Sequence, residues 1–248
     1  MDRFRLYSKA LKEILRTGRD SKVSVAVTIR GRRRPPDEDR EHDSDVIIVG
    51  TEDGRFGVAH HPSARSIGDA LGESVRRIAI AGPPGIRAAC LDALAEDVPT
   101  PDPLDEARAR WKEARTIRAE MVADIVEDLA TGRRLLLIGH SAPILETLRE
   151  RGFDVEVVDA HPGVPYPSRP RDGGHDVTVV TGMVLSNGSI RTVLGSCSPP
   201  IILYSESCPN MTTCLVRSGA VDGAVVERFP FHFLPGETIL ESYIRAKG

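Results

Sequence analysis

The sequence predicts an α/β protein in which a doubly wound parallel sheet follows a smaller α+β unit. Three observations support this fold class. From residue 133 onward, apolar strands alternate with helix-like segments, which is typical of a parallel sheet covered on both faces. The first hundred residues contain instead a hairpin pattern, and three prolines within residues 98–103 separate the two parts. We therefore expect a cap domain at 1–98, a linker and long helix at 99–131, and the sheet domain at 132–248.

The cap domain is expected to begin with an amphipathic helix over residues 3–17. Val23, Val25, Val27 and Ile29 then alternate as they do in a half-buried strand. An Asp-Gly pair lies between the two apolar runs that follow, and it supplies the positive φ of a tight hairpin turn. Helical patterns at 66–82 and 83–97 complete this unit.

Apolar residues recur at three- and four-residue steps from 104 to 131, which predicts one long helix. We expect this helix to brace the two units against each other. The sheet domain then alternates strand and helix to its end. Strands are expected at 134–139, 153–160, 175–182, 199–205 and 221–229. Helices are expected at 141–152, 187–197, 209–219 and 236–248, the last of them closing the chain.

Composition restricts the classes of partner. A net charge of −3 and an isoelectric point near 6.2 give no general attraction to nucleic acid or to an anionic membrane. No apolar run reaches the ~18 residues of a membrane span, and the charged N-terminus does not resemble a signal peptide. We therefore expect a cytoplasmic protein with a small-molecule ligand. Its four cysteines include no C-x-x-C pair, so we expect reduced thiols and no zinc ribbon.

Ligands of doubly wound sheets bind beyond the carboxyl ends of the strands. Gly139 permits a tight turn after the first strand of the sheet domain, and Ser141 can cap the next helix. Asp159 follows 20 residues after Gly139, the separation at which an acidic side chain binds ribose hydroxyls. The loop lacks the three-glycine fingerprint for a pyrophosphate, so NAD and FAD are not expected and S-adenosylmethionine is favoured. The alternative is that Asp159 is only a partner for a turn or helix. The predicted cofactor-binding residues are Gly139, His140, Ser141, Asp159, Thr181 and Gly182.

Two catalytic candidates lie near the later strand ends. A thiol at a helix N-terminus has a lowered pKa, and Cys208 precedes such a helix. His232 is a candidate general base or metal ligand. The alternatives are a buried, unreactive Cys208, a helix cap at Asn187 and simple core packing of the phenylalanines around His232. The predicted substrate-binding residues are Asn187, Ser205, Ser207, Asn210 and Phe231.

Several stretches resemble a known family. "TGMVLSNGSI", "LYSESCPN" and "VVERFPFHFLPGET" resemble the Rossmann-like "putative heavy-metal chelation" domain of unknown function. "GVAHH" and "RAACLDAL" resemble the enolase-N-terminal-like domain that is often fused to it, and "KEARTIRAEMV" is similar to the linker helix between the two. The resemblance implies a Rossmann-like sheet domain behind an enolase-N-like cap. It supplies no catalytic residues.

Three classes of function remain open. The favoured class is an enzyme, such as a transferase or lyase, that binds an adenosyl-type ligand and whose reaction type is not fixed. The second is a metal-binding protein that holds a divalent metal through Cys208 and His232, with Cys197 or His140 as further ligands. Thiolate and imidazole together suit zinc, copper or nickel. The third is a non-catalytic ligand-binding module whose cap domain forms the surface of a homodimer.

Overall fold

The structure is a computed structural model that describes residues 2–33, 42–61, 67–158, 174–197, 200–228 and 236–245. Within these ranges, only the backbone is described at 30–33, 42–44 and 111–112. The helices are α1 (Arg3–Thr17), the 3-10 helix η1 (Gly68–Ala70), α2 (Val75–Ala81), α3 (Pro84–Ala95), α4 (Trp111–Leu129), α5 (Ala142–Glu150), α6 (Met183–Ser186), α7 (Ile190–Ser196) and α8 (Pro209–Ser218). The strands are β1 (Val23–Arg33), β2 (His42–Thr51), β3 (Phe56–His60), β4 (Asp105–Ala109), β5 (Arg134–Ile138), β6 (Asp154–Val158), β7 (Val177–Thr181), β8 (Ile201–Ser205), β9 (Gly223–Glu227) and β10 (Thr238–Ile244).

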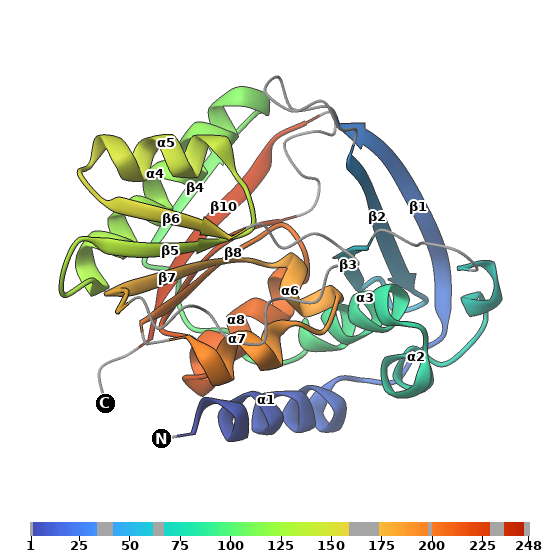
Figure 1. The fold of residues 1–248 in the computed structure, drawn as a ribbon. Helices are drawn as coiled ribbons and strands as arrows, with labels where there is room; N and C mark the ends of the chain where they lie inside the picture. Colours follow the sequence, from blue (N-terminus) through green and yellow to red (C-terminus); the bar gives the residue numbers. More distant parts are fainter. Residues whose placement is uncertain are drawn as a thin grey trace.

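The N-terminal strands form an antiparallel sheet in the order β1-β2-β3. The predicted hairpin is confirmed, and Gly54 in its turn has a φ of +87°. Helix α3 packs on β2 and β3, with α2 beside it (Figure 1). Gly57 permits this close approach, because a Cβ at that position would collide with the backbone of α3 at Ala89 and Ala93.

The second sheet has seven strands in the order β4-β10-β9-β8-β7-β5-β6. Neighbouring strands from β6 to β9 are parallel, and β10 and β4 continue the sheet in antiparallel pairing. Helices α4 and α5 cover one face of this sheet, α6, α7 and α8 lie on the other, and α1 packs against α7 and α8 (Figure 1). The protein therefore has a mixed α/β fold, with a mostly parallel sheet as predicted.

The hydrophobic core is continuous between the N-terminal unit and the seven-stranded sheet. One cluster of buried residues joins Ile14 of α1 and Leu94 of α3 to Val180 and Leu203 of the sheet. A second cluster lies on the opposite face, between the sheet and helices α4 and α5. Because α1 packs on α3, α7 and α8, the N-terminal unit and the sheet domain bury a common surface.

The edge of β3 that β2 does not cover is closed by hydrogen bonds from other parts of the chain. Its alternate residues Phe56, Val58 and His60 direct backbone groups to this edge. Their partners are Glu96 Oε2 for Phe56 N (3.1 Å), Asn210 Nδ2 for Phe56 O (3.4 Å), Asp92 Oδ2 for Val58 N (3.0 Å), Cys208 N for Val58 O (2.8 Å), Ser207 Oγ for His60 N (3.0 Å) and Ser186 Oγ for His60 O. An edge strand whose backbone groups are satisfied in this way is not open to pairing with another chain. The N-terminal sheet is thereby fastened to α3 and to the segments that follow β7 and β8.

The structure corrects the prediction of one helix over residues 104–131. The stretch Asp105–Ala109 is strand β4, and the helix begins at Trp111. Ala107 and Ala109 alternate with charged residues, so the same positions satisfy a period of two, and pairing with β10 selects the strand. Helix α4 also does not brace the two units, because it packs on α5 and on strands of the seven-stranded sheet.

The predicted closing helix at 236–248 is wrong as well, since Thr238–Ile244 is strand β10 between β4 and β9. Thr238, Leu240 and Ser242 are buried at alternate positions, as a strand pattern requires. The helical pattern expected at 66–82 is interrupted at Gly72, whose φ is +78°, so only η1 and α2 form there.

In the described part of the chain, no helix combines the length and apolar character needed to cross a bilayer.

Candidate functional site

The helices that follow the adjacent parallel strands β5 and β7 lie on opposite faces of the seven-stranded sheet. After β5 it passes to α5, on the face that α4 covers, and it then forms β6 on one side of β5. After β7, on the other side of β5, it passes to α6 on the opposite face. The carboxyl ends of two adjacent parallel strands therefore lead away from each other. This is the topological switch point at which open α/β sheets form a ligand crevice.

Gly139 and Thr181 meet at this point. Gly139 has a φ of +91°, which favours glycine. A Cβ on Gly139 would lie 2.9 Å from Thr181 Cβ and 3.5 Å from the hydroxyl oxygen of Tyr204. The Tyr204 hydroxyl donates to the carbonyl oxygen of Gly139 at 3.4 Å. The predicted tight turn after β5 is therefore confirmed, and the ends of β5, β7 and β8 are in contact on the α4 face.

His140 and Ser141 complete the turn into α5. His140 is exposed, and Ser141 is half-buried at the N-cap position. The predicted cap position is correct, but the Ser141 side chain makes no capping hydrogen bond. The backbone N–H of Gly139 donates to the carbonyl oxygen of Val158 at 2.9 Å. Asp159, the next residue after Val158, lies outside the described residues, so its predicted contact with a ribose stays a prediction.

The predicted residues in and around the turn between β8 and α8 form hydrogen bonds to other groups of the protein. Ser205 is fully buried and donates to the carbonyl oxygen of Ser207. Ser207 Oγ accepts from His60 N, and the amide of Asn210 lies between Phe56 and Arg228. Ser207 and Asn210 fasten the turn to β3, and Ser205 holds the turn itself.

Two further predicted residues also have internal contacts. Gly182 packs against the β8 turn, where a Cβ would lie 2.8 Å from the carbonyl oxygen of Ser207. Asn187 lies between α6 and α7, and its Oδ1 accepts from Ser189 N at 2.9 Å. Ser189, and not Asn187, is the N-cap of α7.

Cys208 corrects the prediction of a reactive thiolate. It stands at the N-cap of α8 with a φ of +57°, the only positive φ of a non-glycine residue in the described ranges. The side chain is fully buried. Burial raises the pKa of the Cys208 thiol well above its ordinary value of 9.0, and the nearby carboxyl of Asp92 raises it further. Desolvation therefore outweighs the helix N-terminus, and Cys208 is a protonated thiol in the core.

Asp92 caps α8 in place of Cys208, and the sequence analysis missed it. Its side chain comes from α3 and is fully buried. Oδ1 accepts from Met211 N at 2.9 Å, and Oδ2 accepts from Val58 N at 3.0 Å. Burial raises the pKa of Asp92 to about 7, although the N–H groups of Met211, Val58 and Asn210 lower it in part. The sequence signal for Asp92 was an aspartate on the apolar side of a predicted helix.

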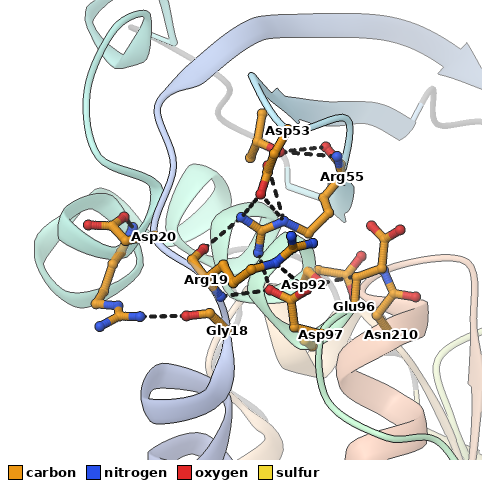
Figure 2. Close-up of polar contacts among 12 residues, drawn as sticks. Gly18, Arg19, Asp20, Asp53, Arg55, Asp92, Glu96, Asp97 and Asn210 are labelled. Atoms are coloured by element: carbon orange, nitrogen blue, oxygen red, sulfur yellow. Dashed lines mark hydrogen bonds and ion pairs between the residues drawn. The ribbon is translucent and has the colours of Figure 1, made fainter.

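Charged residues gather beside Asp92 at the end of α3 (Figure 2). Arg55 is 3% exposed and lies on the turn between β2 and β3. Its guanidinium donates to Asp97 Oδ2 at 2.7 Å, to Asp53 at 3.1 Å and to the carbonyl oxygen of Arg19 at 2.6 Å. This network holds together the hairpin turn, the end of α3 and the segment before β1. We assign it a structural role, because its three acceptors all belong to the protein.

A second group that the sequence analysis missed lies at the carboxyl ends of β8 and β9. Arg118 of α4 is 5% exposed, and its Nη1 donates to Glu227 Oε2 at 2.7 Å. The same Nη1 is paired with Glu206, which follows β8 directly. Two carboxylates and one guanidinium thus lie on the α4 face of the edge that carries Gly139 and Thr181. The sequence signal for this group was the presence of two acidic residues, Glu206 and Glu227, at two strand ends.

The described residues include no group of three or more histidine, cysteine or acidic side chains that could hold a metal ion. All four cysteines lie in the described ranges, and none forms a disulfide. His232 and Phe231 lie outside the described residues, so the predicted roles of both stay predictions. A thiolate site at Cys208 does not fit the buried, protonated thiol found there.

Residues 121–221 match the family model described as "Putative heavy-metal chelation" (DUF364). This range extends from α4 to α8 and includes the strand ends at Gly139 and Thr181. No curated protein matches the chain.

Among solved structures, the chain is similar to a protein of unknown function from the DUF364 family of Desulfitobacterium hafniense. The two share 13% identity over 90% of this chain and 86% of the other, with a TM-score of 0.57. A dipeptide epimerase from Methylococcus capsulatus shares 12% identity over 90% of this chain and 97% of the other, with a TM-score of only 0.38. That value does not establish a common fold, so the enolase-like character of the N-terminal unit stays a prediction. The chain is thus similar over residues 121–221 to the family described as "Putative heavy-metal chelation", and it shares its fold with a solved protein of that family.

Proposed function

We propose that the protein binds a small molecule in the crevice between the carboxyl ends of β5 and β7, and that the ligand is an adenosyl compound, with S-adenosylmethionine favoured. One observation carries the proposal. The chain leaves these adjacent strands towards opposite faces of the sheet, with Gly139 and Thr181 in contact at the divergence. The Gly139–Ser141 turn would hold the polar end of the ligand, and Asp159 would accept the ribose hydroxyls. An enzymatic role as a transferase or lyase accords with such a site, and the reaction type stays open because fold does not fix chemistry.

A thermal-shift screen tests this proposal. S-adenosylmethionine, S-adenosylhomocysteine, nucleotides and NAD are added to the purified protein, and we expect the adenosyl compounds to raise the Tm. A ligand at 100 times its Kd stabilises the folded state by about 2.7 kcal/mol. Asp159→Ala should abolish the shift, whereas Asp154→Ala, an exposed residue at the opposite end of β6, should preserve it. An unchanged shift in Asp159→Ala would show that ribose recognition at this residue is wrong.

Metal binding is the second candidate, and the description of the matched family favours it. Its ligands would have to include His232 and residues other than Cys208, because the Cys208 thiol is buried and protonated. Elemental analysis of protein purified without a metal-affinity tag tests this candidate. A stoichiometric metal that is lost in His232→Ala would support it. A metal lost in Cys208→Ala would contradict the assignment of a protonated thiol.

A further inference from the structure

We propose that Arg118 binds a carboxylate oxygen of the ligand, so that the ligand class is an adenosyl compound that carries an amino-acid group. This inference rests on the function proposed above. Arg118, Glu206 and Glu227 are not among the predicted site residues, although Glu206 lies between two of them, Ser205 and Ser207. Glu206 and Glu227 act as positioning residues that fix the guanidinium.

The hydrogen bonds of Arg118 are incomplete. Its Nη1 serves both glutamates, Glu227 at 2.7 Å and Glu206. Its Nε is buried and has no hydrogen-bond partner in the described part of the chain. Buried donors are nearly always satisfied in native proteins, so a donor without an acceptor calls for an explanation. Because two carboxylates restrain Nη1, the guanidinium cannot simply rotate to satisfy Nε within the protein.

The position of Arg118 relates it to the crevice. Tyr204 is paired with Thr181 in the register of β7 and β8, and Glu206 lies two residues beyond Tyr204. Alternate residues of a strand share a face, and the contact with Arg118 of α4 confirms that Glu206 lies on the α4 face. Adjacent strands are about 4.8 Å apart. The partners of Arg118 lie at the ends of β8 and β9, which are one and two strands away from β7. Across the sheet Arg118 is therefore about one to two strand spacings from β7, and Glu206 is about 7 Å beyond Tyr204 along the strand, a span that an adenosyl compound with an amino-acid group can bridge.

A carboxylate is the acceptor that best fits a guanidinium edge, because hydrogen bonds between two charged groups are short and strong. Glu206 connects the buried pair to the surface, since its side chain is 21% exposed whereas that of Arg118 is 6% exposed. An oxygen that enters beside Glu206 would meet the Nε–H of Arg118. The adenosyl part would remain in the crevice.

The chain contains a matched control. The Nε of Arg76 on α2 is also buried without a partner, and the Nη2 of Arg76 donates to the carbonyl oxygen of Gly18. Arg76 belongs to the N-terminal unit and not to the carboxyl edge of the seven-stranded sheet. A lysine at either position keeps the charge and removes the Nε–H group. Only the substitution at Arg118 should affect the ligand.

The experiment is calorimetric titration of wild type, Arg118→Lys and Arg76→Lys with S-adenosylhomocysteine and with adenosine, which lacks the amino-acid group. We expect Arg118→Lys to weaken S-adenosylhomocysteine about tenfold or more, the loss of one hydrogen bond between charged groups, and to leave adenosine within about twofold. Arg76→Lys should change neither. Equal affinity of Arg118→Lys and wild type for S-adenosylhomocysteine would overturn the inference, as would an equal loss for both ligands. If wild type binds S-adenosylhomocysteine no more tightly than adenosine, the inference alone is overturned. If wild type binds neither compound, the proposed function is overturned as well.

Circular dichroism shows whether Arg118→Lys folds. If it does not, Glu206→Gln replaces it, because the partly exposed Glu206 side chain tolerates a neutral isostere. Arg118 then loses one charged restraint, and we expect weaker binding of S-adenosylhomocysteine with adenosine unchanged. Unchanged binding of both ligands in Glu206→Gln would then overturn the inference.

Discussion

Asp92→Ala should destabilise the protein by several kcal/mol, although Asp92 is not one of the residues of the proposed crevice. The substitution removes the acceptor for the buried N–H groups of Val58 and Met211. A buried donor left without an acceptor costs about 1–3 kcal/mol, so the two donors together predict a loss of about 2–6 kcal/mol. This is a large fraction of the ~5–15 kcal/mol that stabilises a typical domain. It should appear as a lower midpoint in urea denaturation followed by circular dichroism.

Glu96→Ala is the matched control, because Glu96 lies immediately after α3 and its Oε2 accepts from Phe56 N at 3.1 Å. This contact is exposed, so water can replace the carboxylate, and we expect a change within about 0.5 kcal/mol. The comparison isolates burial, since both carboxylates accept a backbone N–H of the same edge strand. Equal losses in the two variants would refute the reasoning that burial makes Asp92 essential to the contact between β3 and α8.

Four further predictions follow from the same geometry. Burial raises the pKa of Asp92 from 3.8 to about 7, so the folded state holds a proton that the unfolded chain has lost. The stability from this group is present below about pH 4 and is lost as the pH rises to 7, by at most about 1.4 kcal/mol per unit, and Asp92→Asn should remove that slope from urea denaturation curves. Gly139→Ala should lower the Tm more than Gly152→Ala, because both have a positive φ but only Gly139 would place a Cβ against a neighbour; equal shifts would contradict the contact. A thiol-reactive reagent should modify the half-buried Cys197 before the three buried cysteines, as peptide mass spectrometry can show, and rapid labelling of a second cysteine would contradict the buried assignment. Arg55→Ala should cost about 1–3 kcal/mol in urea denaturation, because Asp53 and Asp97 lose a buried charged partner while Asp97 keeps Arg19 and Asp53 keeps Thr51; a loss below about 0.5 kcal/mol would contradict its role.

The periodic elements of the fold could be predicted from the sequence. The helix at α1, the Asp-Gly hairpin and the strands from β5 to β9 all carry strong local patterns, and each was found. Strands β4 and β10 were missed because their short patterns fit both periods, and pairing selects the strand, of β4 with β10 and of β10 also with β9. Long-range pairing of this kind is not visible in local hydrophobic spacing.

The candidate site was predictable where a backbone constraint determines it. Gly139 at the end of an apolar run indicated a tight turn, and the structure confirms it. Cys208 was misjudged because a helix N-terminus is a local feature, whereas desolvation depends on what covers the thiol. Asp92 and Arg118 were missed for a similar reason. Their partners are more than 80 residues away in some cases, as for Arg118 and Glu227, so only the folded chain brings them together.

Hydrogen–deuterium exchange with S-adenosylhomocysteine tests the proposed crevice most directly, because it locates bound ligand without any substitution. We predict that saturating ligand slows exchange in peptides that span residues 138–145 and 180–187, the ends of β5 and β7, while peptides that span β1 and α2 exchange at their original rate. Protection confined to the N-terminal unit, or no protection anywhere, would contradict a ligand site at the divergence of β5 and β7.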